Sequence, residues 1–153
     1  MGTSHLTLQP ERFLTEGPIP HSRVSEVTGE WAQDHRIGGV VDFTGVVRAD
    51  ETAAGRVRAI EFTAHRNMAE RSLREIAERT AGGYEAEVLR VHLQHALGTV
   101  AVGEVPLVVV VGAAHRAEAF ELCREIVEAL KAEVPIYGKE LTEDGDHTWK
   151  VNT

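Results

Sequence analysis

Hydrophobic and polar positions change period several times along the chain, and each change predicts an element of secondary structure. Residues 5–9 alternate as a short strand does, and the apolar side chains of residues 22–33 are spaced for one helix face. A β-branched run over residues 40–48 predicts a buried strand. Small and charged residues at 49–56 predict an exposed, mobile loop before another strand at 57–64.

A helix is predicted to begin near Asn67, because Asn67 and Glu70 have the spacing of a capping box, and to stop at residues 82–83, which are both glycine. The apolar side of this helix is predicted to hold Met68, Ser72, Leu73, Ile76 and Ala77. Residues 84–94 resemble a strand, and a short separate strand falls within residues 98–103.

The most apolar segment, residues 107–111, predicts a central strand. The helix that follows runs from about residue 116 to 131 and cannot continue past Pro135. Its apolar positions follow the helical period: Ala119, Phe120, Cys123, Ile126, Val127 and Leu130. Two short strands are predicted at 136–137 and 149–151, joined by a turn rich in Asp and Gly.

The order of these elements indicates the fold class. Strands cluster between the helices instead of alternating with them one by one, which favours an α+β fold with antiparallel strands over a doubly wound parallel sheet. The chain has 153 residues, enough for one domain with a core of its own, and no segment repeats or is of low complexity. We therefore expect residues 1–153 to form a single domain.

Composition narrows the classes of function. The formal net charge of -8 argues against broad binding to nucleic acid or to a membrane surface. No apolar run approaches the ~20 residues of a membrane span, and residues 1–10 lack the pattern of a signal peptide. Cys123 is the single cysteine, so no intrachain disulfide can form, and its place on an apolar helix face predicts a packing role. We expect a cytoplasmic protein.

The candidate chemistry begins with His115 and Arg116, which follow the central strand at the start of a helix. Backbone N–H groups and the positive end of the helix favour an anion there, although the pair could equally cap or solvate the helix. Lys131 lies sixteen residues further on, so a straight helix separates it from His115 by roughly 24 Å. Either the two serve different pockets or a symmetric partner brings them together; Lys131 could also be an ordinary cation at a helix C-terminus.

Other polar residues give weaker signals. Arg48 ends a predicted strand beside the predicted loop, where an arginine can grip a ligand as the loop closes or can simply be solvated. His92 and His95 stand three apart on a predicted strand and so point to opposite faces, which excludes a metal pair. No other group has the spacing of a zinc site, and neither a GxSxG motif nor a Gly-rich phosphate loop is present.

Four stretches, taken in order, resemble the large, catalytic-type subunit of molybdopterin synthase, the MoaE family. They are VDFTGVVR at 41–48, NMA at 67–69, GAAHRAEAF at 112–120 and LKAEVPIYGKE at 130–140. The turn at 144–146 and Trp149 follow where the family has a Gly and a Trp. The resemblance covers roughly residues 37–150, and the order and spacing of the motifs make it specific.

This resemblance implies an α/β-hammerhead fold with additional antiparallel strands and a homodimer. Two small ubiquitin-like subunits would bind at its outer ends and give a heterotetramer. It implies a sulfurtransferase: the small subunit inserts a Gly-Gly tail that ends in a thiocarboxylate, and its sulfur passes to cyclic pyranopterin monophosphate (precursor Z) to form the dithiolene of molybdopterin. The resemblance implies no metal and no organic cofactor for this step of molybdenum cofactor biosynthesis.

The same resemblance implies the site residues. Lys131 and Lys139 are expected to be catalytic. The residues expected to contact substrate are Val46, Val47, Arg48, His115, Arg116, Lys131, Gly138, Lys139 and Glu140. The His and Arg of the family's site come from the other subunit of the dimer. Such a dimer would bring His115 and Lys131 together although they lie far apart along the helix. Proton donors and positive charge beside a developing oxyanion suit thiocarboxylate transfer.

Two departures from the family leave alternatives open. The family's second essential lysine corresponds to Gly138, so Lys139 is expected to reach in instead, helped by the flexibility of glycine, although neighbours on a strand face opposite ways. The family's His-Arg-x-Gly begins at His95 here and has Ala96 in place of arginine. The chain is therefore either an active sulfurtransferase or a non-catalytic paralogue that binds the small subunit or pterin.

Overall fold

The computed structural model describes residues 5–150, which form three helices and nine strands in one domain. The helices are α1 (Arg23–Trp31), α2 (Arg66–Ala81) and α3 (Arg116–Glu133). The strands are β1 (Leu6–Gln9), β2 (Leu14–Glu16), β3 (Gly39–Gly45), β4 (Glu51–Thr52), β5 (Gly55–Ala64), β6 (Leu89–Ala101), β7 (Leu107–Ala113), β8 (Ile136–Thr142) and β9 (His147–Trp149). The predicted α+β class and single domain are confirmed.

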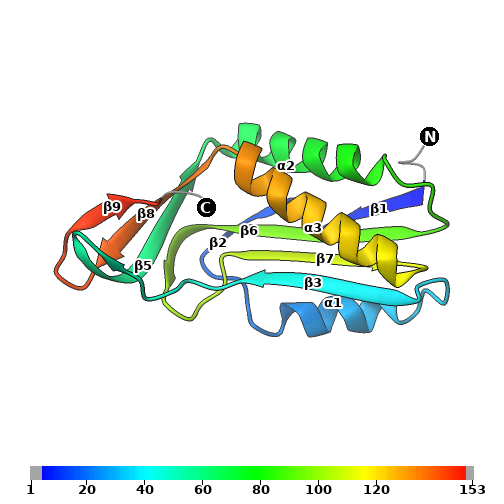
Figure 1. Ribbon diagram of the computed structural model, residues 1–153, viewed down its shortest axis with the longest axis horizontal. Helices are drawn as coiled ribbons and strands as arrows, with labels where there is room; N and C mark the ends of the chain where they lie inside the picture. The colour runs from blue at the N-terminus through cyan, green and yellow to red at the C-terminus, as the bar shows by residue number, and fades with distance from the viewer. Residues whose placement is uncertain (1–4, 151–153) are drawn as a thin grey trace.

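One continuous sheet runs through the molecule in the order β3-β7-β6-β5-β8-β9, with β1 and β2 parallel to β6 and all other pairs antiparallel. The long strand β6 joins the two ends: its first half pairs with β7, and its second half pairs with β5. Figure 1 shows α2 and α3 on one face of the central strands, α1 on the other, and β5, β8 and β9 projecting to one side.

The central strand β7 is buried along its whole length because helices cover both of its faces. Side chains on one face pack against α2 and α3; those from β7 are Leu107, Val109 and Val111. Side chains on the other face pack against Val27 and Trp31 of α1; those from β7 are Val108 and Val110. Each fully buried Val or Leu contributes roughly 1.5–3 kcal/mol, so β7 is the strand on which the helical layers are assembled.

The edge strand β3 differs from its prediction. A buried strand was expected over residues 40–48, but the strand ends at Gly45 and pairs with β7 alone among the described strands. Val40 and Phe43 are 39% and 37% exposed. The β-branched run predicted a strand correctly, but composition alone could not reveal that one edge of it is open.

The predicted mobile loop at 49–56 is instead a tight hairpin. Strand β4 pairs with the start of β5, and the Thr52 hydroxyl donates to the Gly55 carbonyl at 2.8 Å. Gly55 has a φ of +119°, which a residue with a side chain rarely adopts, so glycine permits this turn. The hairpin directs the chain back into β5 directly beyond the segment that carries Arg48.

Helix α2 begins two residues earlier than predicted. His65 is its N-cap, and the His65 Nδ1 accepts a hydrogen bond from the Met68 N–H at 3.3 Å. Asn67 lies inside the helix, so the predicted capping box is wrong. Glu70 instead accepts hydrogen bonds from the backbone of β2 and the residue before it. Met68 is 52% exposed and not on the apolar side.

Other predictions differ from the structure in detail. Parts of the strands predicted at 84–94 and 98–103 form one strand, β6, which begins only at Leu89 and ends at Ala101. Gly98, with a φ of +90°, lets the chain bend without ending the pairing. Strand β2 was missed. Phe120 is 60% exposed on α3 although it was placed on the apolar face. The β8–β9 hairpin is confirmed, while residue 151 of the predicted last strand lies outside the described residues.

Candidate functional site

Two adjoining cavities lie where the segment after β3, strands β5 and β8, and the end of α3 meet. The larger has a volume of about 270 Å³ and the smaller about 30 Å³. Lys131, Lys150 and Phe62 line both cavities. The floor is a separate hydrophobic cluster, in which Phe62 and Ile60 of β5 pack against β6. A small apolar base with two amines above it is a suitable site for an anionic group.

The segment after β3 brings three predicted residues to the larger cavity: Val46, Val47 and Arg48. Val47 fixes the segment, because its N–H donates to the Glu104 carbonyl at 3.0 Å and its carbonyl accepts from the Gly103 N–H at 2.9 Å. Arg48 is 80% exposed along its side chain, and its Nε lies 2.8 Å from the Asp50 carboxylate. This exposed ion pair is weak, so Arg48 can exchange Asp50 for an anionic ligand at small cost.

Lys131 lies in the last turn of α3 and is half-buried between the two cavities. Burial lowers the pKa of the Lys131 amine below its ordinary value, and the charge of Lys150 lowers it further. A lysine with a lowered pKa holds its proton less tightly, which suits a group that transfers protons. The predicted role of Lys131 therefore has a physical basis beyond stabilising a helix end.

Lys150 was not predicted as a site residue. Its backbone N–H donates to the Gly138 carbonyl at 2.8 Å, which holds the end of the β8–β9 hairpin against the cavities. A Cβ on Gly138 would lie 3.6 Å from the Lys150 Cβ and 3.0 Å from Ile60. The sequence signal that could have found Lys150 is that all three lysines of the chain fall in its last quarter.

His95 lines the smaller cavity from β6. The His95 Nδ1 lies 2.8 Å from the Ala96 carbonyl, which can only accept, so Nδ1 carries the proton and Nε2 is left as an acceptor in the neutral ring. Burial, aided by the charge of Lys131, lowers the pKa of His95 to about 4. The ring packs edge-on against Phe62 at a centroid distance of 5.1 Å. His92 points to the opposite face, as predicted, where it contacts Gln94.

Successive residues of strand β8 face opposite sides of the sheet. Gly138 lines the smaller cavity and Glu140 the larger one, where the Glu140 carboxylate accepts from the Thr148 hydroxyl at 2.9 Å. Lys139, between them, faces the other way, and its Nζ lies 3.7 Å from the Glu61 carboxylate. The described chain therefore does not bring Lys139 into either cavity, contrary to the expectation that it reaches in beside Gly138.

His115 and Arg116 lie at the opposite end of α3 from Lys131, about 22–24 Å away along the helix axis. Both are exposed, and His115 makes no side-chain capping bond. Arg116 lies beside the start of β3, since a Cβ built on Gly39 would be 3.4 Å from the Arg116 Cα. Within one chain, the predicted His and Arg are thus not part of the lysine-lined cavities.

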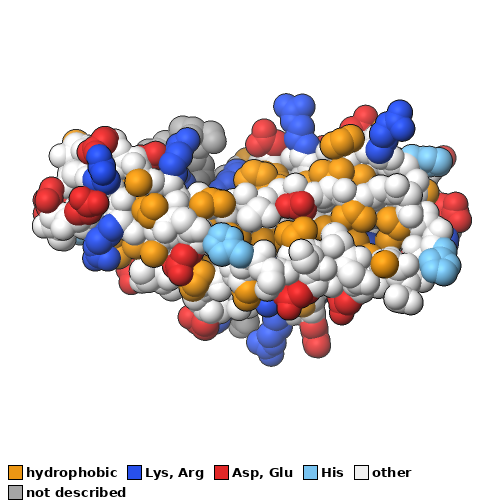
Figure 2. All heavy atoms as spheres, turned by 90° about the horizontal axis from the view of Figure 1, so that it is seen from below, with side chains coloured by type: hydrophobic (Ala, Val, Ile, Leu, Met, Phe, Trp, Pro, Cys, Tyr) orange, Lys and Arg blue, Asp and Glu red, His pale blue; other side chains and the backbone are white. Residues whose placement is uncertain are grey.

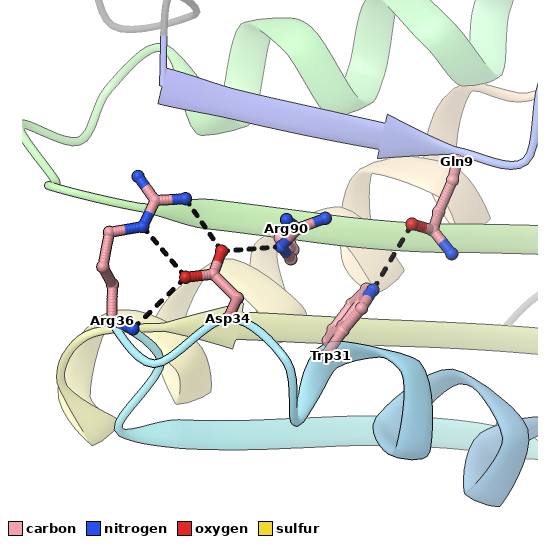
Figure 3. A network of polar contacts seen from close by, with 5 residues as sticks. All are labelled: Gln9, Trp31, Asp34, Arg36 and Arg90. Atoms are coloured by element: carbon pink, nitrogen blue, oxygen red, sulfur yellow. Dashed lines mark hydrogen bonds and ion pairs between the residues drawn. The ribbon is translucent and has the colours of Figure 1, made fainter.

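A more open hollow of about 690 Å³ lies at the other end of the sheet, near α1. Three of its charged groups are paired with one another: Asp34 accepts from Arg36 at 2.8 Å and from Arg90 at 2.9 Å (Figure 3). Hydrogen bonds from Arg36 and Arg90 hold the pKa of Asp34 well below its usual range. Trp31 adds a bond to Gln9 at 3.3 Å. These pairs tie the segment after α1 to β6, which is a structural role.

Over residues 5–150, no cluster of three or more His, Cys, Asp or Glu side chains is arranged to hold a metal ion. In the same part of the chain, no helix has the length and apolar character that crossing a membrane requires. Cys123 is buried against β7, where burial raises the pKa of its thiol to about 11, and this agrees with the predicted packing role.

Comparison with known proteins yields one family. Residues 14–133 match the family described as "MoaE protein". A molybdopterin synthase catalytic subunit from Nostoc sp. is 37% identical over 118 residues, covering 77% of this chain and 70% of the relative. The crystal structure of molybdopterin synthase from Staphylococcus aureus is similar with a TM-score of 0.79 and 24% identity, covering 94% of this chain and 98% of that one. A protein–protein complex of subunits 1 and 2 of molybdopterin-converting factor from Helicobacter pylori has a chain similar with a TM-score of 0.74 and 18% identity, covering 93% and 88%.

Proposed function

This chain belongs to the MoaE protein family, and we propose that it is the catalytic subunit of a molybdopterin synthase. The observation that carries the proposal is the half-buried Lys131, placed at a cavity that Arg48 and Glu140 also line. A lysine with a lowered pKa beside a fixed guanidinium is a suitable pair for proton transfer and for binding an anion. The proposed pathway is molybdenum cofactor biosynthesis, in the cytoplasm.

The proposed reaction transfers sulfur from the thiocarboxylated C-terminus of a small ubiquitin-like subunit to cyclic pyranopterin monophosphate. In each transfer the thiocarboxylate sulfur forms a bond to a side-chain carbon of the pterin, and water then cleaves the acyl carbon–sulfur bond, which releases the small subunit with a carboxylate end. The cyclic phosphate opens, and two such transfers give the dithiolene. Lys131 donates or accepts the proton that moves as each carbon–sulfur bond forms. Arg48 binds the phosphate or the carboxyl end of the tail, and the backbone of Val46 and Val47 forms the adjoining wall. The reaction as proposed uses no metal or organic cofactor.

The proposed synthase also contains the small subunit as a partner of this chain. A tail that ends in Gly-Gly is narrow enough to enter a cavity with a volume of about 270 Å³, whereas a bulky C-terminus is not. The Helicobacter pylori neighbour is a complex of two subunits, which supports a partner of this kind. We propose the same pairing here, with one small subunit on each catalytic subunit.

We further propose a homodimer that completes the site. Strand β3 is an open edge, and its neighbouring apolar side chains Val40, Phe43 and Val46 are 39%, 37% and 53% exposed. Figure 2 views the molecule from below and shows hydrophobic side chains gathered along the middle of that face. Antiparallel pairing of two β3 edges about a two-fold axis would set the Gly39 end of one strand beside the Gly45 end of the other. Arg116 lies beside Gly39, and the lysine-lined cavity lies beside Gly45.

In this dimer, His115 and Arg116 of one subunit approach Lys131 and Arg48 of the other. Each site then holds cations from both subunits, which explains why a single chain leaves the two exposed residues at the start of α3 without an evident role. The shared site also favours binding of a substrate that carries a phosphate, because charge-assisted bonds to phosphate are the stronger kind.

The alternative of a non-catalytic paralogue rests on Gly138 and Ala96. Ala96 is fully buried in the core beneath the cavities, so an arginine would have no room there without repacking. The absence of the family's arginine therefore follows from how the core of this chain packs. Gly138 leaves one fewer amine on β8. The question is therefore whether the cations that remain are sufficient for turnover.

Reconstitution tests the proposal directly. The purified chain, a thiocarboxylated small subunit and the cyclic pterin are combined, and molybdopterin is measured. Formation of molybdopterin at a rate that saturates with both substrates is the expected result. Binding of the small subunit without product would favour the non-catalytic paralogue, and neither binding nor product would contradict the proposed function as a whole.

A further inference from the structure

Lys150 directly follows β9 at the end of the β8–β9 hairpin, where the two cavities adjoin. It lines both cavities together with Lys131, although the two lysines come from different elements. We propose that Lys150 is the second cation of the synthase site, which binds, together with Lys131, the anionic group of the substrate that enters the cavity. This inference rests on the proposed function and names a residue that the sequence did not single out.

The backbone fixes where Lys150 stands. Its N–H donates to the Gly138 carbonyl at 2.8 Å, which continues the pairing of β8 with β9 by one residue beyond Trp149. Residue 138 has no side chain, and the space beside it is bounded by Ile60 at 3.0 Å, Phe62 at 3.3 Å and the Lys150 Cβ at 3.6 Å from where a Cβ would be. The side chain of Lys150 thus begins at the point on the cavity wall where β8 offers none.

The charges around the cavities favour the binding of an anion by a second amine. The positive groups are Lys131 from α3, Lys150, and Arg48 from the segment after β3. The negative groups that face the larger cavity are Asp50, which pairs with Arg48, and Glu140, which accepts from Thr148. His95 faces the smaller cavity and is neutral near pH 7 because burial lowers its pKa to about 4. An anion between the two lysines therefore relieves their mutual repulsion.

Lys150 also acts on Lys131 through charge. The pKa of Lys131 is lowered first by burial and then by Lys150, so removal of the Lys150 charge raises the pKa of Lys131. The two effects can be separated in an experiment. Loss of an anion contact raises KM or weakens binding, whereas loss of the charge effect moves the pH dependence of turnover.

Two substrate groups share the required chemistry: the cyclic phosphate of the pterin and the carboxyl end of the small subunit's tail. Either is an anion with oxygens that a lysine amine can bind. A raised KM for the pterin at saturating small subunit identifies the phosphate. Weaker binding of the small subunit in its carboxylate form, measured by calorimetry without pterin, identifies the tail. Both results support the inference.

The test compares Lys150→Met, which keeps the aliphatic stem, with Lys150→Arg, which keeps the charge, in the reconstituted complex. We expect Lys150→Met to lower kcat/KM by about 10- to 100-fold, the usual effect of losing one hydrogen bond to a charged group. The limb of the pH profile that reports Lys131 should move to higher pH in Lys150→Met. Lys150→Arg should restore most of the activity and the original position of that limb.

Lys139→Met is the matched control, because it removes a lysine from the adjacent part of the hairpin on the face away from the cavities. Wild-type turnover in Lys150→Met would overturn the inference while leaving the proposed function intact. A loss in Lys150→Met that Lys150→Arg does not restore, with an unmoved pH profile, would also overturn it, since that pattern marks a purely structural residue. Absence of product from the wild-type chain would instead count against the proposed function.

Discussion

The Nζ of Lys139 lies 3.7 Å from the carboxylate of Glu61. These residues oppose each other in the β5–β8 register, on the side of the sheet that faces away from the cavity residues Gly138 and Glu140. The contact is partly exposed, so it contributes at most about 1 kcal/mol. The lysine that the sequence suggested as catalytic is thus engaged with a carboxylate on the wrong side of its strand.

We therefore predict that Lys139→Ala leaves kcat and KM near their wild-type values and changes stability by less than about 1 kcal/mol. Molybdopterin formation and thermal unfolding of the purified variant measure the two effects. Glu61→Ala serves as the control, since it removes the other partner of the same contact. A large fall in kcat for Lys139→Ala alone would show that the hairpin rearranges during turnover and that Lys139 enters the site.

Replacement of Lys131 should separate activity from stability. Lys131→Met is predicted to lower kcat by about 10²- to 10⁴-fold, the usual contribution of a positioned proton-transfer group. The pKa of Lys131 is lower in the folded chain than in the unfolded one, so its charge opposes folding below the folded pKa, and this penalty disappears as pH rises through the unfolded value. Lys131→Met should hence unfold at a higher temperature than wild type at pH 7.

The comparison at two pH values tests that argument. The gain in melting temperature of Lys131→Met should shrink as pH rises from 7 to above the ordinary lysine pKa of 10.5, because only there has the wild-type amine lost its proton in both states. A variant that is less stable than wild type at pH 7 would mean that the Lys131 charge stabilises the fold, as an ordinary cation at the end of α3 would.

The sequence predicted those features that depend on local pattern. The run of valines that became β7 and the helical period that became α3 were recognised because each is buried on a regular face. Lys131 lies in the last turn of that helix, and its expected catalytic role came from the family resemblance. Phe120 was misplaced because the period of α3 does not say where its buried stripe ends.

Features that depend on contacts between distant segments could not be predicted. Glu70 was interpreted as a capping residue, yet it binds backbone groups 56 and 57 residues away. Lys150 reaches the cavities only because β9 pairs with β8. Its proposed role as a cation of the site depends on the absence of a side chain at Gly138. A one-dimensional pattern carries no information about which strands become neighbours in the sheet, so these assignments required the structure.

Glu70 anchors the N-terminal strands to α2. Its two carboxylate oxygens accept hydrogen bonds from the backbone N–H groups of Phe13 at 2.8 Å and Leu14 at 2.9 Å. Glu70→Gln replaces one of these acceptors with a donor, so one backbone N–H loses its partner. We predict a loss of about 1–3 kcal/mol in the free energy of unfolding, measured by urea denaturation. Glu75→Gln, at an exposed position of the same helix, should change it little.

His95 should make the fold sensitive to acid. Its pKa is about 4 in the folded chain and 6.5 ordinarily, so between these values the unfolded chain binds more protons and stability falls as pH falls. The difference corresponds to about 3 kcal/mol lost by pH 4. His95→Gln, which can still donate to the Ala96 carbonyl, should show a smaller loss between pH 7 and pH 4. An equal loss in both proteins would assign the acid sensitivity to carboxylates.

The shared site makes the sharpest prediction about assembly. Lys131→Ala removes the amine at one end of α3, and Arg116→Ala removes the guanidinium at the other, so each variant alone should be inactive if both groups act on one substrate. In a mixed dimer, Lys131 of one subunit meets Arg116 of the other at one site, while the second site lacks both. Mixing the two variants under conditions that exchange subunits should then restore activity.

Random exchange gives half of the dimers mixed composition, and each mixed dimer has one intact site of two, so activity should reach about a quarter of the wild-type value. Phe43→Lys, which places a charge on the open β3 edge, should yield a monomer by light scattering and abolish the restoration. Because a monomer has Lys131 and Arg116 about 22 Å apart along α3, it cannot assemble the site by itself. Full activity in a stable Phe43→Lys monomer would rule out a site built from two subunits, and His115 and Arg116 would then have to act elsewhere.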